Sequence, residues 1–278
     1  MAHITVPAAE EILDKQFPVL DKGFITLVDY MGGDDRIVTA ARISTNQGLK
    51  SPEEDRKLIH YLIKNRHSSP LEMCELIFHV KLPIFVAREW IRHRTANVNE
   101  MSGRYVQLAN EFYLPELSRI RYQSKSNKQA SADDMPDQET QRYMLNCLLN
   151  HQDISYQLYD ELVKDNIAKE VARINLPLSI YTQWYWKIDL HNCLHFLKLR
   201  MASNAQWEIG QYANQMAGMV KAVAPIIYQA FEEYVLNALT LPSTLKDDLI
   251  NYLGSIAIDT ADNEERTAKD LLVRIKKL

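Results

Sequence analysis

Short strand-like stretches and longer helical ones follow one another along the chain. Residues 74–81 alternate between apolar and polar side chains, and residues 23–30 and 178–188 are rich in β-branched and aromatic types, so each predicts a β-strand. Apolar side chains recur at helical spacing over residues 140–173, which predicts a long helix or a helix pair. The longest helical pattern covers residues 189–239. Strands therefore alternate with helices.

Capping signals mark where three of these helices begin. The Ser51–Glu54 segment has the form of a capping box with proline in the first turn, which predicts a helix to about Asn65. Either Asp34 or Asp35 is expected to cap the helix that follows the first strand. Asp189 is a third candidate cap, at the start of the longest helical pattern.

A dense polar cluster occupies residues 88–105, directly after the apolar residues 82–87. It holds four arginines, one histidine, two glutamates, two asparagines and one serine, interleaved with apolar side chains. We expect a helix from Pro83 with Arg88 and Arg92 on one face, followed by turns. Guanidinium forks and a Ser-Gly-Arg turn suit a phosphate-bearing ligand, although a helix end with surface ion pairs would contain the same residue types.

Composition narrows the class of protein and its partners. The 278 residues, 46% of them hydrophobic, can form one large domain or two small ones with a substantial core. A net charge of -4 argues against general nucleic-acid binding, so an anion site must be a local basic pocket. The three cysteines form no C-x-x-C pair, which is typical of reduced thiols. Without a signal-peptide pattern or an apolar run of roughly 18 to 20 residues, we expect a soluble, cytoplasmic protein.

Two histidines, His191 and His195, have the i, i+4 spacing of a metal-binding pair. No H-E-x-x-H motif is present and no acidic residue nearby in sequence completes a triad, so two histidines hydrogen-bonded at a helix start are the simpler interpretation. A metal-dependent nucleotide hydrolase remains one alternative. A non-catalytic nucleotide-binding module remains another.

The polar cluster contains a specific spacing of residues. Arg92-His93-Arg94 is followed after seven residues by Ser102, with Asn99-Glu100 before the serine and Arg104-Tyr105 after it. This arrangement closely resembles the R-H-R-x7-S signature of flavin-dependent thymidylate synthases. The three basic residues alone would mean little, but the seven-residue gap and the flanking pairs make the match specific.

The resemblance covers roughly residues 23–234 and implies a fold as well as an activity. The implied fold is α+β, with an antiparallel or mixed sheet flanked by long helices. Residues 1–240 are expected to form the family's domain. The helical pattern after residue 241 predicts that residues 241–278 are a helical C-terminal extension of that domain, which the family does not require. The polar segment 122–139 lacks the side chains needed to bury surface, so we expect a mobile loop that the family does not require.

The resemblance also implies roles for individual residues. The expected site for deoxyuridine monophosphate (dUMP) comprises Arg92, Glu100, Ser102, Gly103, Arg104, Arg173 and Arg200. The expected flavin-contacting residues are Ser44, His67, Ser69, Glu72, His93, Arg94, Thr95, Asp189, His191 and His195. Three positions depart from the commonest family residues, namely Glu89 in place of glutamine, Asn97 in place of serine and Asp189 in place of asparagine.

The implied reaction is the reductive methylation of dUMP to thymidine monophosphate (dTMP). FAD is the implied cofactor, with NADPH as its reductant and 5,10-methylenetetrahydrofolate as the carbon donor. Because the cofactor carries the redox chemistry, the protein must position rings and balance charge. Arg200 is the expected catalytic residue, since a guanidinium can stabilise negative charge on the pyrimidine. The family forms homotetramers whose sites combine several chains, and neither nucleic acid nor a membrane is an expected partner.

Overall fold

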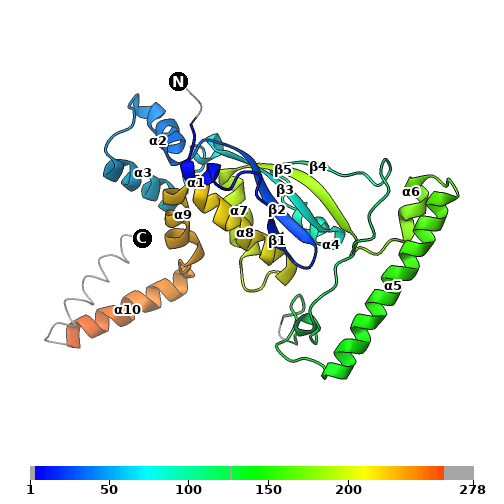
Figure 1. The fold of residues 1–278 in the computed structure, drawn as a ribbon. Coiled ribbons are helices and arrows are strands. Elements are labelled where there is room, and N and C mark those ends of the chain that lie inside the picture. The colour runs from blue at the N-terminus through cyan, green and yellow to red at the C-terminus, as the bar shows by residue number, and fades with distance from the viewer. Residues whose placement is uncertain (1–3, 126, 260–278) are drawn as a thin grey trace. The chain divides into compact units, whose positions relative to one another are not determined.

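The computed structural model describes residues 4–125 and 127–259 of the chain (Figure 1). It divides into two compact units, residues 1–236 and residues 237–278. The first unit contains all the expected site residues and, in chain order, α1 (Pro7–Glu10), β1 (Phe17–Val19), β2 (Gly23–Met31), α2 (Asp34–Arg42), η1 (Ile43–Thr45), α3 (Pro52–Lys64), η2 (Leu71–Met73), β3 (Glu75–Pro83), α4 (Ile84–Trp90), β4 (Asn97–Glu100), η3 (Leu117–Arg119), α5 (Gln138–Lys164), α6 (Lys169–Ala172), η4 (Arg173–Asn175), β5 (Tyr181–Asp189), α7 (Leu190–Arg200), α8 (Trp207–Val223), α9 (Pro225–Phe231) and the π-helical turn η5 (Glu232–Leu236).

The sheet is antiparallel throughout, with strand order β1-β2-β3-β5-β4. Strand β3 pairs with β5 along its whole length, from Glu75 opposite Asp189 to Pro83 opposite Tyr181. The short edge strand β4 pairs with the other side of β5, and Glu100 lies opposite Trp184. This register places the polar cluster beside β5, the strand that leads directly into α7.

Helices α4, α7 and α8 pack against one face of the sheet and form the core with it (Figure 1). Phe78 of β3 and Trp184 and Trp186 of β5 point to this side and are buried. Trp90, the last residue of α4, packs edge-on against both tryptophans, with ring centroids 5.7 Å from Trp184 and 5.3 Å from Trp186. Buried aromatic rings contribute large apolar areas, so Trp90 anchors the beginning of the polar cluster to the core.

Several predicted elements are confirmed. The strands expected over residues 23–30, 74–81 and 178–188 are β2, β3 and β5. The capping box is formed, since Ser51 and Glu54 satisfy each other's backbone N–H groups at the start of α3. The helix pair expected over residues 140–173 is α5 and α6, and the fold is the expected α+β class.

Two predictions about helix starts and lengths are wrong. Gly33 rather than an aspartate is the N-cap of α2, and the Asp34 carboxylate instead accepts hydrogen bonds from Ile226 N and Ile227 N at 2.9 and 3.0 Å, at the start of α9. The pattern over residues 189–239 is interrupted after α7 and again at Pro225. Proline explains the second break, because it lacks the N–H that a continuing helix requires. At 27 residues, α5 is longer than α7, α8 or α9.

The polar cluster also differs from its prediction. Helix α4 begins after Pro83 as expected but ends at Trp90, so Arg92 lies in the following turn and shares no helical face with Arg88. The next residues form the strand β4, which its sequence Asn-Val-Asn-Glu did not predict. Backbone pairing with β5 holds this strand, and such pairing does not depend on apolar side chains.

The described residues of segment 122–139 form no helix or strand before α5 begins at Gln138, but backbone hydrogen bonds link Tyr122 with Ala132 and Asp134. Tyr122 N donates to Asp134 O at 3.2 Å, and Ala132 N donates to Tyr122 O at 2.8 Å. The mobility expected for this loop stays a prediction. In the second unit, α10 (Ser243–Asp259) agrees with the helical tail expected there, and the rest of that tail lies outside the described residues. None of the described helices is long and apolar enough to cross a bilayer.

Candidate active site

Arg200, the last residue of α7, is held by α4 and the turn that follows it. Its Nη1 forms an ion pair with the carboxylate of Glu89, and its Nε donates to His93 Nε2 at 3.1 Å. The side chains of Arg200 and Glu89 are 18% and 23% exposed, so this pair is less screened by solvent than a surface pair. The guanidinium is therefore fixed in one orientation where the core meets the polar cluster.

His93 is neutral in this arrangement. Because Nε2 accepts the hydrogen bond from Arg200, the ring proton belongs on Nδ1. Burial of the ring, the charge of Arg200 and, third, His195 lower the pKa of His93 from 6.5 to about 4. At neutral pH the imidazole of His93 is uncharged. It can therefore contact a ligand beside the fixed guanidinium, but it carries no second proton that it could donate.

A cavity of about 200 Å³ lies next to His93 and Arg94. Its remaining walls are Ile91, Ala96, Val98, Trp184 and Trp186. The Nε1 of Trp184 is buried and has no hydrogen-bond partner in the part of the chain that the structure describes. The mostly apolar walls and the guanidinium of Arg94 fit a planar heterocycle that carries carbonyl groups, such as the flavin ring.

Strand β4 and the turn after it carry the residues expected to bind the nucleotide. Glu100 Oε1 accepts a hydrogen bond of 2.7 Å from Thr182 Oγ1, which orients the carboxylate. Ser102 Oγ accepts from Arg104 N at 3.3 Å and closes a small turn. Within residues 4–125 and 127–259, Ser102 has no carboxylate or imidazole as a hydrogen-bond partner.

Gly103 is the point at which Arg173, distant in sequence, reaches this turn. A Cβ built on Gly103 would lie 3.2 Å from both Arg173 Nη1 and Leu108 Cδ1, so glycine leaves room for this close approach. Arg104 Nε pairs with Glu170 Oε2 at 3.1 Å, and both side chains are more than half exposed. Arg104 and Glu170 also line a cavity of about 290 Å³. The turn, α6 and η4 thus form one polar surface.

Four of the residues expected to contact flavin lie between α2 and β3. Ser44 Oγ donates to Ala41 O at 3.0 Å, as a helix-end hydroxyl commonly does. The His67 ring packs edge-on against Tyr61, and Ser69 and Glu72 are exposed. Because η2 packs against α7, this group lies on the same side of the unit as the start of α7.

The other expected flavin residues lie on α7 and in the turn after α4. Asp189 is confirmed as the N-cap of α7, since its carboxylate accepts from Asn192 N at 2.9 Å and from Asn192 Nδ2 at 2.6 Å. The ring of His195 lies 6.0 Å from that of His93, between centroids. Arg94 is exposed and lines the 200 Å³ cavity, and Thr95, the next residue in the chain, is also exposed. The structure therefore brings His93, His195 and Arg200 together.

The expected residues gather in two groups. One contains Arg200 and His93, and the other contains Ser102, Gly103 and Arg173. Among the described residues, no hydrogen bond or ion pair connects one group with the other. Arg92 is exposed and forms no ion pair within the described chain.

Some partners in the site were not identified from the sequence. Thr182 is a buried polar residue in an aromatic strand, and this exception to the pattern is a signal that could have drawn attention to it. In the sequence Glu89 stood out only as a departure from the family pattern. Its pairing with Arg200 could not be predicted, because the two residues are 111 positions apart. Glu170 gave no signal in sequence.

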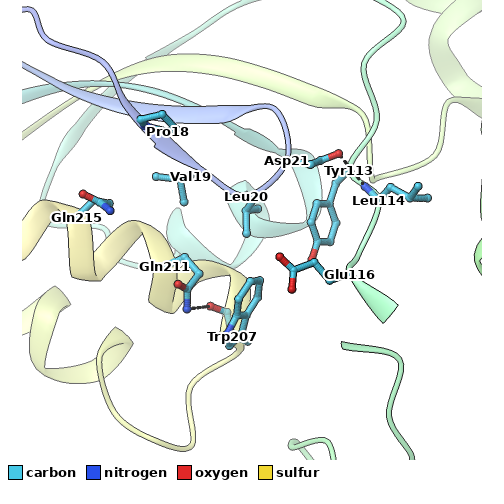
Figure 2. Close-up of a pocket in the computed structure, with 10 residues that line it drawn as sticks. All are labelled: Pro18, Val19, Leu20, Asp21, Tyr113, Leu114, Glu116, Trp207, Gln211 and Gln215. Atoms are coloured by element: carbon cyan, nitrogen blue, oxygen red, sulfur yellow. Dashed lines mark hydrogen bonds between the residues drawn. The ribbon is translucent and has the colours of Figure 1, made fainter. Parts of the chain in front are cut away.

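A further cavity, of about 280 Å³, lies between the β1–β2 hairpin and the N-terminal end of α8 (Figure 2). None of the expected site residues lines it. Its Asp21 carboxylate accepts a 2.6 Å hydrogen bond from Tyr181, and its Tyr113 donates to Glu208 at 3.2 Å. No group of three or more His, Cys, Asp or Glu side chains suited to a metal ion is present among the described residues, so His191 and His195 have no third ligand there.

Comparisons with known proteins agree with this geometry. The family model described as "Thymidylate synthase complementing protein" matches residues 26–226. A flavin-dependent thymidylate synthase of Rickettsia conorii is 45% identical over 97% of this chain and 97% of its own length. The enzyme of the same name from Treponema denticola is 52% identical over 87% of this chain and 91% of its own.

A solved structure is also similar to this fold. It is that of the UMP/dUMP methylase PolB from Streptomyces cacaoi bound with 5-Br UMP, which is 30% identical. The match has a TM-score of 0.70 and covers 79% of this chain and 98% of that one. Since the family model matches most of the chain and relatives about half identical match nearly all of it, this protein belongs to the flavin-dependent thymidylate synthase family.

Proposed function

We propose that this protein catalyses the reductive methylation of dUMP to dTMP. The observation that carries the proposal is the contact of the turn at Gly103 with Arg173. It gathers a hydroxyl, backbone N–H groups and guanidinium forks at one place, and this combination recognises a phosphate-bearing pyrimidine. Two further observations support it, the relatives named flavin-dependent thymidylate synthase and the similarity to a structure bound with 5-Br UMP.

In this proposal the arginines divide between binding and catalysis. Arg92, Arg104 and Arg173 hold the phosphate and the uracil ring, together with Glu100, Ser102 and Gly103. Arg200, oriented by Glu89 and His93, stabilises negative charge on the pyrimidine as it reacts with the carbon donor. Because its orientation is set before the substrate binds, little reorganisation is needed at that step.

FAD is the proposed cofactor, with NADPH and 5,10-methylenetetrahydrofolate as co-substrates. When bound, the flavin supplies the hydride for the methyl group. The residues that would hold it are Ser44, His67, Ser69, Glu72, His93, Arg94, Thr95, Asp189, His191 and His195. The apolar cavity at His93 and Arg94 supports this assignment.

We propose that the active unit is a homotetramer. Helix α5 buries Gln141, Gln152 and Tyr159 but leaves an apolar series exposed, namely Met144, Leu148, Leu149, Ile154 and Leu158. Exposed apolar surface of this extent marks an interaction site. A second copy would also account for the separation of Arg200 from the nucleotide turn within one chain, since one chain can then supply each group. Light scattering should give about four times the chain mass of 32.2 kDa.

Two further assignments complete the proposal. Residues 1–240 constitute the catalytic domain, with residues 241–278 as a helical extension. The reaction takes place in the cytoplasm, where dUMP, folate and NADPH are available, and involves neither nucleic acid nor a membrane.

The test uses the purified protein and its colour. Oxidised flavin bands should be visible, dUMP should stimulate NADPH oxidation, and dTMP should form when 5,10-methylenetetrahydrofolate is added. A colourless protein that releases inorganic phosphate from nucleotides and loses activity to a chelator would replace the proposal with a metal-dependent hydrolase. Nucleotide binding without turnover under all these conditions would leave only a binding module.

A further inference from the structure

A cavity of about 490 Å³ lies where the loop after η3 meets the N-terminal end of α8. Its lining includes Arg119, Arg121 and Arg200, together with Trp207 and Gln211. Trp207 and Gln211 also line the neighbouring cavity in Figure 2, where both lie at the start of α8. Because Arg200 also binds Glu89 and His93, the 490 Å³ cavity adjoins the candidate active site.

Arg119 is fixed in this cavity but is not neutralised. Its guanidinium carbon lies 4.7 Å from the ring centroid of Trp207, in a cation–π contact. Its Nε is buried without a hydrogen-bond partner, and it forms no ion pair with any described residue. Because Arg119 lines the cavity with its charge unpaired, an oxyanion bound there would interact favourably with the guanidinium.

Neither carboxylate in the lining, Asp133 or Glu208, forms an ion pair with Arg119. Asp133 lies 3.4 Å from Arg121 Nη1, but its side chain is fully exposed, and such a pair contributes little. Glu208 accepts hydrogen bonds from Tyr113 Oη at 3.2 Å and from Gln206 Nε2 at 3.0 Å. Arg121 is oriented by a further bond of 2.9 Å from its Nε to Ser118 O.

We propose that Arg119 and Arg121 bind the phosphate or carboxylate group of an anionic co-substrate whose reactive part reaches the site at Arg200. The proposal rests on the proposed function, and it adds a binding site for the co-substrate. Planar guanidinium forks match both kinds of oxyanion. NADPH offers phosphates and the folate offers the carboxylates of its glutamate tail. The phosphate and uracil of dUMP are assigned to Arg92, Arg104 and Arg173, none of which lines this cavity.

The test measures binding to the FAD-loaded protein by calorimetry, so that it does not depend on turnover. The probes are NADP⁺, 5,10-methylenetetrahydrofolate with one glutamate, and dUMP. We expect Arg119→Gln to weaken one of the two co-substrate probes by about tenfold, as the loss of a charge-assisted hydrogen bond does, and Arg121→Gln to weaken the same probe. The affected probe identifies the source of the anion. The affinity for dUMP should stay within about twofold.

Arg142→Gln is the matched control, because this exposed arginine on α5 lines neither this cavity nor the one beside His93. Flavin content and the thermal midpoint show whether each variant is folded, and Arg121→Gln carries the test if loss of the Trp207 contact unfolds the Arg119 variant. Unchanged affinity for both co-substrate probes in the folded variants, or a loss confined to dUMP, would overturn the inference. Thymidylate formation by the unaltered protein is measured separately, so failure of the proposed function is distinguished from failure of this site.

Discussion

Arg200 donates its Nε–H to Nε2 of His93 over 3.1 Å, so that a permanent charge at the end of α7 lies against a neutral ring of the R-H-R segment. The same guanidinium pairs with Glu89, which belongs to α4. Because no second proton can reach His93 Nε2 without breaking this bond, the protonation of the ring and the position of the arginine are coupled.

The pKa of His93 should therefore depend on Arg200. The charge of Arg200 is the second cause, after burial, of the lowering to about 4. Arg200→Gln removes the charge but not the burial, so we expect the pKa of His93 to rise part of the way towards 6.5. Titration of the imidazole by NMR measures it, with the exposed His151→Gln as the control. A pKa that does not move would contradict the coupling.

Protein stability should follow the same titration. The folded pKa of about 4 lies below the ordinary 6.5, so between these pH values the unfolded chain binds more protons at this position. The contribution of His93 to the free energy of unfolding is complete above about pH 6.5, and it is lost as the pH falls from 6.5 to about 4. Urea unfolding at pH 7 and pH 5 should show a smaller loss of unfolding free energy for His93→Gln than for the unaltered protein. An equal loss in both proteins would show that His93 does not contribute.

Replacing Arg200 by lysine should impair turnover. Lysine keeps the charge but cannot bond Glu89 and His93 at once through a planar fork. We expect Arg200→Lys to lose more than about tenfold in kcat, a barrier increase of about 1.4 kcal/mol. The control is Lys198, whose side chain is exposed on the same helix, changed to Arg. Near-normal turnover by Arg200→Lys would remove this residue from the catalytic step.

Gly103→Ala should affect the nucleotide more than the fold. The added Cβ would meet Arg173 Nη1 and Leu108 Cδ1 at 3.2 Å, and both are ends of flexible side chains that can move. We expect the KM for dUMP to rise several-fold, roughly 1 kcal/mol of lost binding, with little change in the thermal midpoint. Gly48→Ala is the control, since a Cβ there meets nothing within 4 Å. The same KM in both variants would mean that Arg173 does not bind the nucleotide.

Ser102 should bind substrate and should not act as a nucleophile. A serine is a weak nucleophile unless a base within hydrogen-bond reach takes its proton, and among the described residues its Oγ contacts only Arg104 N, at 3.3 Å. We expect Ser102→Ala to weaken dUMP binding while dTMP still forms at saturating substrate. Single-turnover oxidation of the reduced flavin measures this. Complete loss of product from a folded, FAD-loaded variant, or a serine adduct trapped in the unaltered protein, would contradict it.

Local patterns in the sequence were sufficient for much of the fold and for the family. The alternation in β3, the capping box at Ser51 and the cap at Asp189 each depend on neighbours within a few residues, and all three formed as predicted. The seven-residue gap between Arg94 and Ser102 identified the functional segment for the same reason, because it is a property of one contiguous stretch.

Only the tertiary structure decided which distant groups meet. Strand β4 forms because β5 lies beside it, and Asp34 binds the start of α9 although its sequence suggested a cap for its own helix. The pairing of Arg200 with Glu89 joins residues 111 apart, and the stacking of Arg119 on Trp207 joins two other distant segments. The sequence determined the local elements and the chemistry of their side chains. Packing of the helices on the sheet determined which charges are paired. Pairing depends on the distance between two charges, and a local sequence pattern does not contain that distance.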